Sequence, residues 1–430
     1  MRRSKADASP RRTVDRRGAR ALENRRFRLS FRCKMANALL RPVKAAMKLF
    51  GKRFDLVFLV FVALFAVAAQ GSHKLLAPFW DYSSYTSALT RYHLGVDPYG
   101  IAASDFPLVY PPIFLNLFAN VPFLAVYLLF ALATLAYVVY RVRRTDFVWA
   151  ASVGFLAGGA GVGALLTANF AIFSHLLIVM LLYSASRSER RAALGYGLAT
   201  LVIVLFASIK IYFAAYALVF LFLPKGIRYF FIIPICVACV DAAQMLLEPQ
   251  LWAGFETRLR WQVLTQHDSG LVLSGILQQR VASLSALQDV LIHEAIVVAL
   301  FLYGINPLRE PRTIGFNEVS GKLFYVIAFA IILNPRLKEY DIGALFACCY
   351  ISLFQSTRPE DRAQRLIAYV VPVAFAAAWM LARLTHVFLF LDLMWIVSVY
   401  GLFLAISMRQ RALRKVGHAR PPSHIGIRQA

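Results

Sequence analysis

The chain has 430 residues, of which 60% are hydrophobic and 16% are charged, and its mean hydropathy is +0.61. This composition excludes a soluble globular domain of that length. Apolar runs of helical length recur along the whole chain, and they are too long for barrel strands. Because a bilayer accepts only helices or closed barrels, the sequence predicts an all-α polytopic membrane protein.

The formal net charge of +25 is concentrated at the amino terminus, where residues 1–53 carry 18 Lys and Arg against 3 Asp and Glu. An arm of this kind is compatible with nucleic-acid binding. The positive-inside rule explains it better, so we predict a disordered cytosolic arm that contacts anionic membrane lipids and no nucleic acid. We expect the apolar run that follows to be the first span rather than a cleaved signal peptide.

Apolar runs and charged breaks predict about twelve transmembrane helices. The predicted spans are 54–70, 121–140, 147–166, 169–186, 192–208, 211–224, 229–247, 291–307, 320–333, 342–356, 365–381 and 386–405. The breaks on the same side as the basic arm all carry clustered Lys or Arg. Because such residues favour the cytosolic side, we expect both termini, including a basic tail at 406–430, in the cytosol. The protein itself is expected in the inner (cytoplasmic) membrane. Two large outer-face loops, 71–120 and 248–290, are expected to meet over one cavity with the turn 334–341.

The first outer segment is unusually rich in acids and aromatic rings for a linker between spans. It contains Asp81, Asp97 and Asp105 among Trp and Tyr residues. Asp81 follows Phe79 and Trp80, and an apolar rim of this kind suits a carboxylate that acts as a general base. The same Asp81 also fits the start of a helix, and we weigh the two interpretations evenly.

Aromatic residues in this segment follow two patterns. Tyr82, Tyr85 and Tyr92 share one face of an amphipathic helix. The stiff sequences that contain Asp97-Pro98-Tyr99 and Tyr110-Pro111-Pro112 offer rings and hydroxyls of the kind found in sugar sites, although each is also ordinary loop punctuation.

Two further polar islands interrupt the apolar runs. Lys210 separates two runs, where an ammonium group either binds an anionic lipid phosphate or snorkels to the interface. In the turn 334–341, Arg336 and Lys338 stand beside two acids, so the turn either binds phosphate or pairs with itself.

Metal and cofactor chemistry is not indicated by the sequence. The five cysteines do not form a disulfide framework, and the histidines lack metal-ligand spacing. His175, inside an apolar run, is expected to hydrogen-bond within the helix bundle. The chain has no Gly-rich phosphate loop, so we predict no metal, no cofactor and no nucleotide site.

The order of these islands resembles the polytopic C-type glycosyltransferases of family 87, from about Phe54 to beyond Asp341. The matching elements are Asp81-Tyr82-x-x-Tyr85, Gly95-x-Asp97-Pro98-Tyr99, Tyr110-Pro111-Pro112, Thr167-Ala168-Asn169, Lys210 and Asn334-Pro335. The family's Gly-Gln-x-Asn element keeps only Asn169 here. Its His-containing turn is replaced by 334–341, which leaves Tyr340 or Asp341 for the role of that His.

The resemblance implies a GT-C-like transmembrane domain over 54–405 that transfers a sugar, most often mannose, from a polyprenyl-phosphate donor to a lipid or glycan acceptor at the outer membrane face. Asp81 would be the base of an inverting reaction, and Lys210, Arg336 and Lys338 would hold the donor phosphate. The implied substrate-binding residues are Tyr82, Tyr85, Asp97, Tyr99, Tyr110, Asn169, Tyr340 and Asp341.

A transporter or flippase for a lipid-linked or anionic substrate is the alternative function. Transporters place charged determinants at the membrane midplane in broken helices, whereas most acids of this chain lie in the outer segments. The sequence therefore favours the enzyme.

Overall fold

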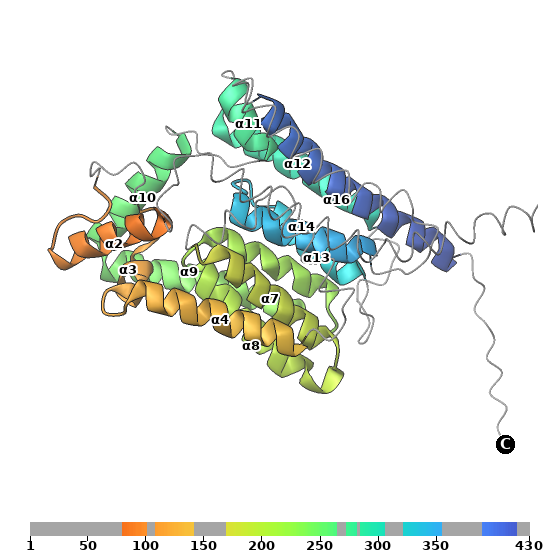
Figure 1. The fold of residues 1–430 in the computed structure, drawn as a ribbon, viewed down its shortest axis with the longest axis horizontal. Coiled ribbons are helices and arrows are strands. Elements are labelled where there is room, and N and C mark those ends of the chain that lie inside the picture. Colours follow the sequence, from red (N-terminus) through yellow and green to blue (C-terminus); the bar gives the residue numbers. More distant parts are fainter. Residues whose placement is uncertain are drawn as a thin grey trace, which may run out of the picture. The chain divides into compact units, whose positions relative to one another are not determined.

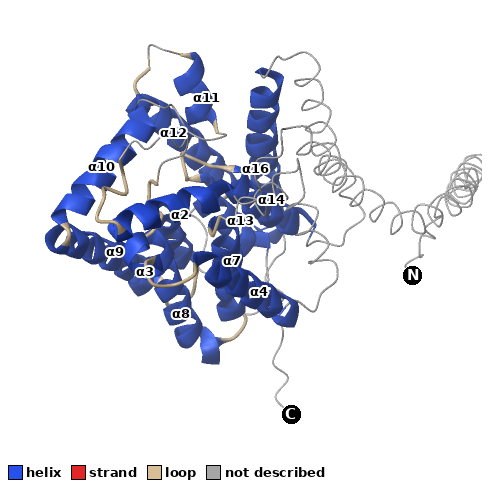
Figure 2. Ribbon diagram, turned by 60° about the vertical axis from the view of Figure 1, so that its left-hand side comes forward, coloured by secondary structure: helices blue, strands red, loops and turns tan. Residues whose placement is uncertain are grey.

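The computed structural model describes residues 80–100, 108–141, 169–264, 272–281, 284–305, 321–354 and 389–418, all within one compact unit. These residues form helices joined by turns, with no strand among them (Figure 2). The all-helical prediction is confirmed for this part of the chain. The predicted basic arm, Asp105 and the predicted spans 54–70, 147–166 and 365–381 lie outside the described residues.

Figure 1 shows the helices in the colours of the chain order. They are α2 (Trp80–His93), α3 (Pro112–Phe118), α4 (Phe123–Arg141), α7 (Ala171–Ser186), α8 (Glu189–Ala207), the 3-10 helix η2 (Ile211–Phe222), α9 (Ile227–Leu247), α10 (Pro249–Leu264), α11 (Leu273–Arg280), α12 (Ala286–Gly304), α13 (Gly321–Ile332), α14 (Glu339–Phe354) and α16 (Leu389–His418). Each predicted span that falls on described residues coincides with a helix. The largest difference is α16, which continues from the last predicted span into the predicted tail.

Two helices, α9 and α12, are long and apolar enough to cross a membrane. Helix α3 and the first part of α4 meet the same test only as one passage bent by 92°. Helices α7, η2, α13 and α14 are apolar but shorter. Side chains such as Phe231 and Ile235 on α9 are exposed, as expected of a surface that faces lipid rather than water. The chain thus carries at least two helices that can span a membrane.

Helix α13 lies at the centre of the helix packing and contacts η2, α12, α14 and α16. Every residue from Leu323 to Ile332 is buried. A helix that is apolar on all sides is stable only when other helices surround it, which accounts for this position.

The predicted break at Lys210 is confirmed. Helix α8 ends at Ala207, and the Lys210 backbone N–H still donates to the Phe206 carbonyl at 2.7 Å. Lys210 itself has an extended backbone, and its carbonyl accepts from the Phe213 N–H at the start of η2. The backbone of Lys210 is thereby fixed between two helices.

The two long segments predicted for the outer face, 71–120 and 248–290, contain helices in their described parts. They contain α2 and α3 in the first, and α10 and α11 in the second. Hydrogen bonds join the first segment to the end of α9 and the start of the second: Asn116 Nδ2 donates to Glu248 Oε1 at 2.9 Å, and the Ile113 N–H donates to Gln244 Oε1 at 2.7 Å. The Asn116–Glu248 contact shows that the two segments meet, and the cavity predicted between them stays a prediction.

An aromatic core holds α2 against α3, α4 and the start of α7. Tyr85 lies 4.8 Å from Phe123 and 5.2 Å from Phe114 between ring centroids, and Phe123 lies 4.9 Å from Phe170. The predicted aromatic face of α2 is therefore the face that packs into the protein.

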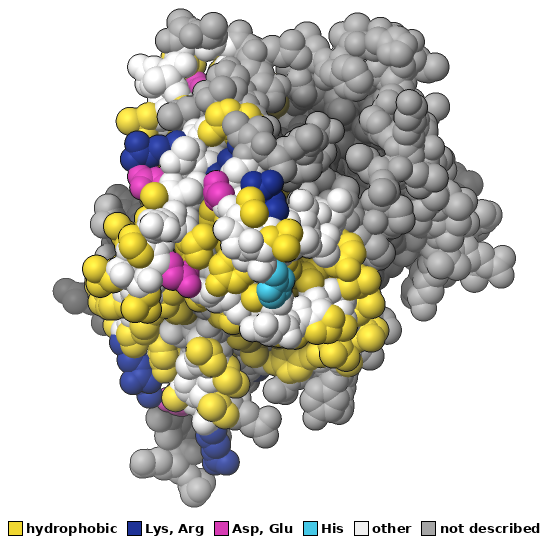
Figure 3. All heavy atoms as spheres, turned by 90° about the vertical axis from the view of Figure 1, so that its left-hand side faces the viewer, with side chains coloured by type: hydrophobic (Ala, Val, Ile, Leu, Met, Phe, Trp, Pro, Cys, Tyr) yellow, Lys and Arg dark blue, Asp and Glu magenta, His cyan; other side chains and the backbone are white. Residues whose placement is uncertain are grey.

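The outward surface at this end of the molecule is mixed. Figure 3 shows hydrophobic side chains broken by scattered charged ones. Leu94 and Val96, after α2, and Leu117 and Val121, around the α3–α4 turn, are exposed. Exposed apolar residues beside polar ones are typical of a region at a membrane interface.

Candidate functional site

One amide side chain stands between the predicted base and the predicted phosphate ligand. Asn169 Nδ2 donates to Asp81 Oδ2 at 2.6 Å, and Lys210 Nζ donates to Asn169 Oδ1 at 2.7 Å. Asp81 comes from the first turn of α2, Asn169 from the residues just before α7, and Lys210 from the α8–η2 break. The fold therefore brings together residues that the sequence separates by 88 and 41 positions.

Asn169 is held in place by its own helix. Its Oδ1 also accepts from the Ala171 N–H at 3.0 Å, which satisfies a donor at the start of α7. The side chain is buried, with 2% of its surface exposed. An amide in this position can accept from an ammonium group and donate to a carboxylate at the same time, so no residue without both functions can replace it.

Aromatic rings surround the Lys210 ammonium group. Its Nζ lies 4.6 Å from the Tyr340 ring centroid and 5.0 Å from that of Tyr110, with Tyr212 at 6.0 Å. Rings at these distances attract a cation and keep its charge partly desolvated. Lys210 is half-buried, so an anion can still approach it.

The hydroxyl groups of Tyr85 and Tyr110 are hydrogen-bonded at 2.8 Å, and the Tyr99 hydroxyl donates to the Tyr110 carbonyl at 2.9 Å. Burial, and then the charge of Asp81, raise the pKa of Tyr85 well above its ordinary value. The Tyr85 hydroxyl is therefore neutral at physiological pH. Of the Tyr85 hydroxyl and the Asp81 carboxylate, the carboxylate is the group that can accept a proton.

A second buried cluster adjoins the first. His175 Nε2 lies 2.8 Å from Asp341 Oδ1, and His175 Nδ1 lies 2.7 Å from the Tyr216 hydroxyl. Asp341 Oδ2 also accepts from Asn334 Nδ2 at 3.2 Å and from the Lys338 backbone N–H at 3.0 Å. An ionised carboxylate only accepts hydrogen bonds, so the contact with ionised Asp341 requires a proton on Nε2.

This second cluster fixes the turn 334–341. Asp341 is fully buried, so its carboxylate braces the turn from inside. The preceding residue, Tyr340, covers Lys210. The Tyr212 ring stacks at 19° to the His175 ring and also faces Lys210. The His175–Asp341 pair is thus placed to set the position of the rings around Lys210.

The remaining predicted site residues are Asp97, Tyr82, Arg336 and Lys338. The Asp97 carboxylate accepts from the Tyr99 N–H at 2.9 Å, which makes it part of a tight turn. Tyr82 packs against Phe123 at 6.0 Å. Arg336 is half-buried and lies within electrostatic reach of Tyr340, and Lys338 is half-buried beside the braced turn.

Sequence reasoning assigned His175 only a general role in the bundle, and it did not single out Tyr212 or Tyr216. His175 is confirmed as a residue that hydrogen-bonds inside the bundle, but its partner is Asp341, 166 positions away. One sequence signal could have indicated this pair: a His lies in one apolar run and an acid lies at the start of another.

No group of three or more His, Cys, Asp and Glu in the described part of the chain is arranged to hold a metal ion. Comparisons with family models, with curated proteins and with solved structures found no match for this chain. The site therefore has to be interpreted from its own chemistry.

We expect Asn169→Ala to lower the rate of any reaction that needs Asp81 and Lys210 together by about 10- to 100-fold, because both lose the group that positions them. The measurement is the initial rate of that reaction with purified protein. Asn116→Ala is the matched control, since Asn116 also bridges two side chains, Tyr92 and Glu248, but on the exposed surface. Equal losses in the two variants would contradict the special role of Asn169.

We expect His175→Ala to lower the free energy of unfolding by about 1–3 kcal/mol, because it removes a partner from a buried carboxylate. Thermal unfolding of the purified protein in detergent measures the change. His93→Ala removes an exposed imidazole that hydrogen-bonds the Ala119 carbonyl at 2.7 Å, and it should leave the midpoint nearly unchanged. A His175→Ala midpoint equal to that of His93→Ala would contradict the bracing role.

Proposed function

We propose that the protein transfers a sugar, a hexose such as mannose, from a polyprenyl-phosphate donor to a lipid or glycan acceptor at the outer membrane face. The observation that carries the proposal is the Asn169 amide between Asp81 and Lys210. A carboxylate and an ammonium group held on either side of one amide suit a reaction that releases a proton at one atom and develops negative charge at another.

In the proposed reaction the acceptor hydroxyl attacks the anomeric carbon of the donor sugar. Its proton passes to the Asp81 carboxylate as the new carbon–oxygen bond forms. The bond between the anomeric carbon and the phosphate oxygen breaks, and its electron pair leaves with polyprenyl phosphate. Lys210 stabilises the charge that grows on this phosphate, and the configuration of the anomeric carbon is inverted.

The aromatic surroundings support a sugar as the transferred group. Tyr110 and Tyr340 present rings within 5.0 Å of the Lys210 ammonium, and sugar rings pack their apolar faces on aromatic side chains. Arg336 and Lys338, in the braced turn, supply further positive charge for the donor pyranosyl phosphate. Tyr82, Tyr85, Asp97 and Tyr99 would shape the acceptor side from α2 and the turn after it.

A lipid-linked donor fits a chain of apolar helices. We propose a GT-C-like domain of about twelve transmembrane helices in the inner (cytoplasmic) membrane. Both termini would lie in the cytosol. The membrane-capable α9 and α12, the shorter apolar helices and the positively charged breaks support this arrangement.

The test is incubation of purified protein with radiolabelled polyprenyl-phosphate sugars and a membrane lipid extract. Formation of a labelled glycolipid together with free polyprenyl phosphate is the expected result. Movement of the labelled donor across vesicles without bond cleavage would replace the proposal with a flippase. A donor that is neither cleaved nor moved by folded protein would reject both functions.

A further inference from the structure

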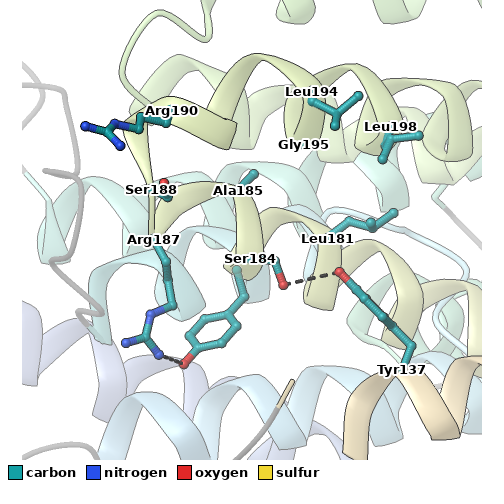
Figure 4. A pocket seen from close by; sticks show the side chains of 11 residues that line it. Tyr137, Leu181, Ser184, Ala185, Arg187, Ser188, Arg190, Leu194, Gly195 and Leu198 are labelled. Carbon is teal, nitrogen blue, oxygen red and sulfur yellow. Dashed lines mark hydrogen bonds between the residues drawn. The ribbon is translucent and has the colours of Figure 1, made fainter. Parts of the chain in front are cut away.

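A cleft of ≈ 470 Å³ opens between α4, α7 and α8, and it shares no lining residue with the Asp81 site (Figure 4). It lies at the Glu189 end of α8, whereas Lys210 follows the opposite end. A helix of this length spans about 28 Å at 1.5 Å per residue. The cleft is therefore a separate feature on the side of the membrane where the sequence places clustered arginines.

One end of the cleft is cationic and polar. Arg187 and Arg190 line it and are both exposed, and Arg187 donates to the Tyr183 hydroxyl at 2.9 Å. Figure 4 shows Arg190 extending from the start of α8. One donating Nη of Arg187 is used in this contact, so a guanidinium with five N–H groups keeps donors for an anion.

The start of α8 adds to the positive potential. Ser188 lies at the N-cap position and lines the cleft, yet its side chain makes no capping hydrogen bond. The first N–H groups of a helix without a side-chain cap attract anions. Glu189, the first residue of α8, pairs with Lys225 at 3.1 Å on the exposed surface.

The other end of the cleft is apolar. Leu181, Leu194 and Leu198 line it, and Leu194 is 70% exposed. The exposed leucines continue along the same face of α8 through Leu201 and Leu205, at helical spacing. Gly195 allows α7 and α8 to approach closely at the cleft, since a Cβ there would meet the Ala185 Cβ at 2.6 Å.

We propose that this cleft binds an anionic membrane phospholipid, with the phosphate at Arg187, Arg190 and Ser188 and an acyl chain along the leucines of α8. A phosphate accepts the paired N–H groups of a guanidinium, and an acyl chain needs a continuous apolar track that begins beside the phosphate. The cleft places both beside each other, at the level where a cytosolic headgroup would lie.

The test measures lipid binding to delipidated protein by native mass spectrometry, with phosphatidylglycerol and phosphatidylcholine of identical acyl chains. We expect wild-type protein to retain phosphatidylglycerol preferentially. The double variant Arg187→Ala with Arg190→Ala should weaken phosphatidylglycerol binding by about tenfold or more. The double Lys variant, which keeps the charge but not the paired N–H geometry, should fall in between.

Arg228→Ala is the matched control. Arg228 is also an exposed arginine that donates to a tyrosine hydroxyl, that of Tyr229 at 2.7 Å, but it does not line the cleft. Arginines elsewhere in the chain contribute equally to all variants, so the difference between the double variant and Arg228→Ala isolates the cleft. Equal binding by these two variants would overturn the proposal.

A third arm distinguishes a lipid headgroup from a free anion. Inorganic phosphate and glycerol 3-phosphate should compete with phosphatidylglycerol only weakly, because they lack the acyl chain. Competition by inorganic phosphate at the concentration at which phosphatidylglycerol binds would overturn the lipid assignment. Loss of phosphatidylglycerol binding in Leu194→Glu, with a normal far-ultraviolet circular dichroism spectrum, would support the apolar track.

Discussion

Asp81→Asn should lower the rate of sugar transfer by about 10²- to 10⁴-fold while leaving donor binding nearly intact, because the amide cannot take the acceptor proton but keeps the shape of the side chain. The substitution also changes the contact with Asn169, where a carboxylate oxygen now accepts at 2.6 Å, but an amide oxygen in the same place can still accept. The measurement is single-turnover formation of glycolipid under saturating donor.

Asp241→Asn makes the same chemical change on α9, where the carboxylate accepts only a 3.4 Å hydrogen bond from Gln244 within the helix. It should transfer sugar at close to the wild-type rate. Expression and detergent extraction of the two variants should match. Full transfer activity in Asp81→Asn would remove Asp81 as the base and return it to the role of a helix-start residue.

Lys210→Met should lower kcat/KM for the donor by about 10²- to 10³-fold, because the phosphate loses its principal positive partner when its charge increases most. Methionine keeps the length of the side chain between the Tyr110 and Tyr340 rings, so packing changes little. The measurement is transfer rate against donor concentration, which separates loss of binding from loss of turnover.

Lys225→Met is the control for this variant, because Lys225 lies after the other end of η2 and its ammonium forms an exposed ion pair with Glu189. Exposed pairs of this kind contribute little. An unchanged donor dependence in Lys210→Met would mean that Lys210 only extends to the membrane interface. A defect in both variants would indicate a general effect of lost positive charge.

Much of the candidate site could be predicted because its residues interrupt apolar sequence. Asp81, Asn169 and Lys210 each stand out where a charged or amide side chain meets a helix end, and the structure places them in one hydrogen-bonded row. Chemistry in a membrane protein concentrates at such interruptions, because a buried polar side chain must find a partner.

The second cluster could not be predicted in the same way. Tyr216 and His175 lie inside apolar runs, where a hydroxyl and an imidazole look like ordinary packing residues. Their pairing with each other and with Asp341 depends on how η2, α7 and α14 pack, and sequence periodicity carries no information about which helices are neighbours. The pairing becomes visible only in the folded structure.

The helices of the second long segment, 248–290, were missed for a different reason. Helix α10 carries Glu256, Arg258 and Arg260 and has no apolar run of membrane length. Its helicity follows from packing against the first segment, where Phe255 lies 6.2 Å from Tyr99 and Gly254 closely contacts the same ring. Tertiary packing of this kind overrides weak local signals.

The pitch of η2 sets the distance between Lys210 and Lys225, which flank its two ends. Twelve residues in a 3-10 helix, Ile211–Phe222, rise about 24 Å, whereas an α-helix of the same sequence would rise about 18 Å. Lys210 therefore stands about one α-helical turn farther from Lys225 than its sequence separation suggests. Any rewinding of this segment into an α-helix would shorten the distance between Lys210 and Lys225 by about 6 Å. The helix type therefore determines how far apart these two lysines stand.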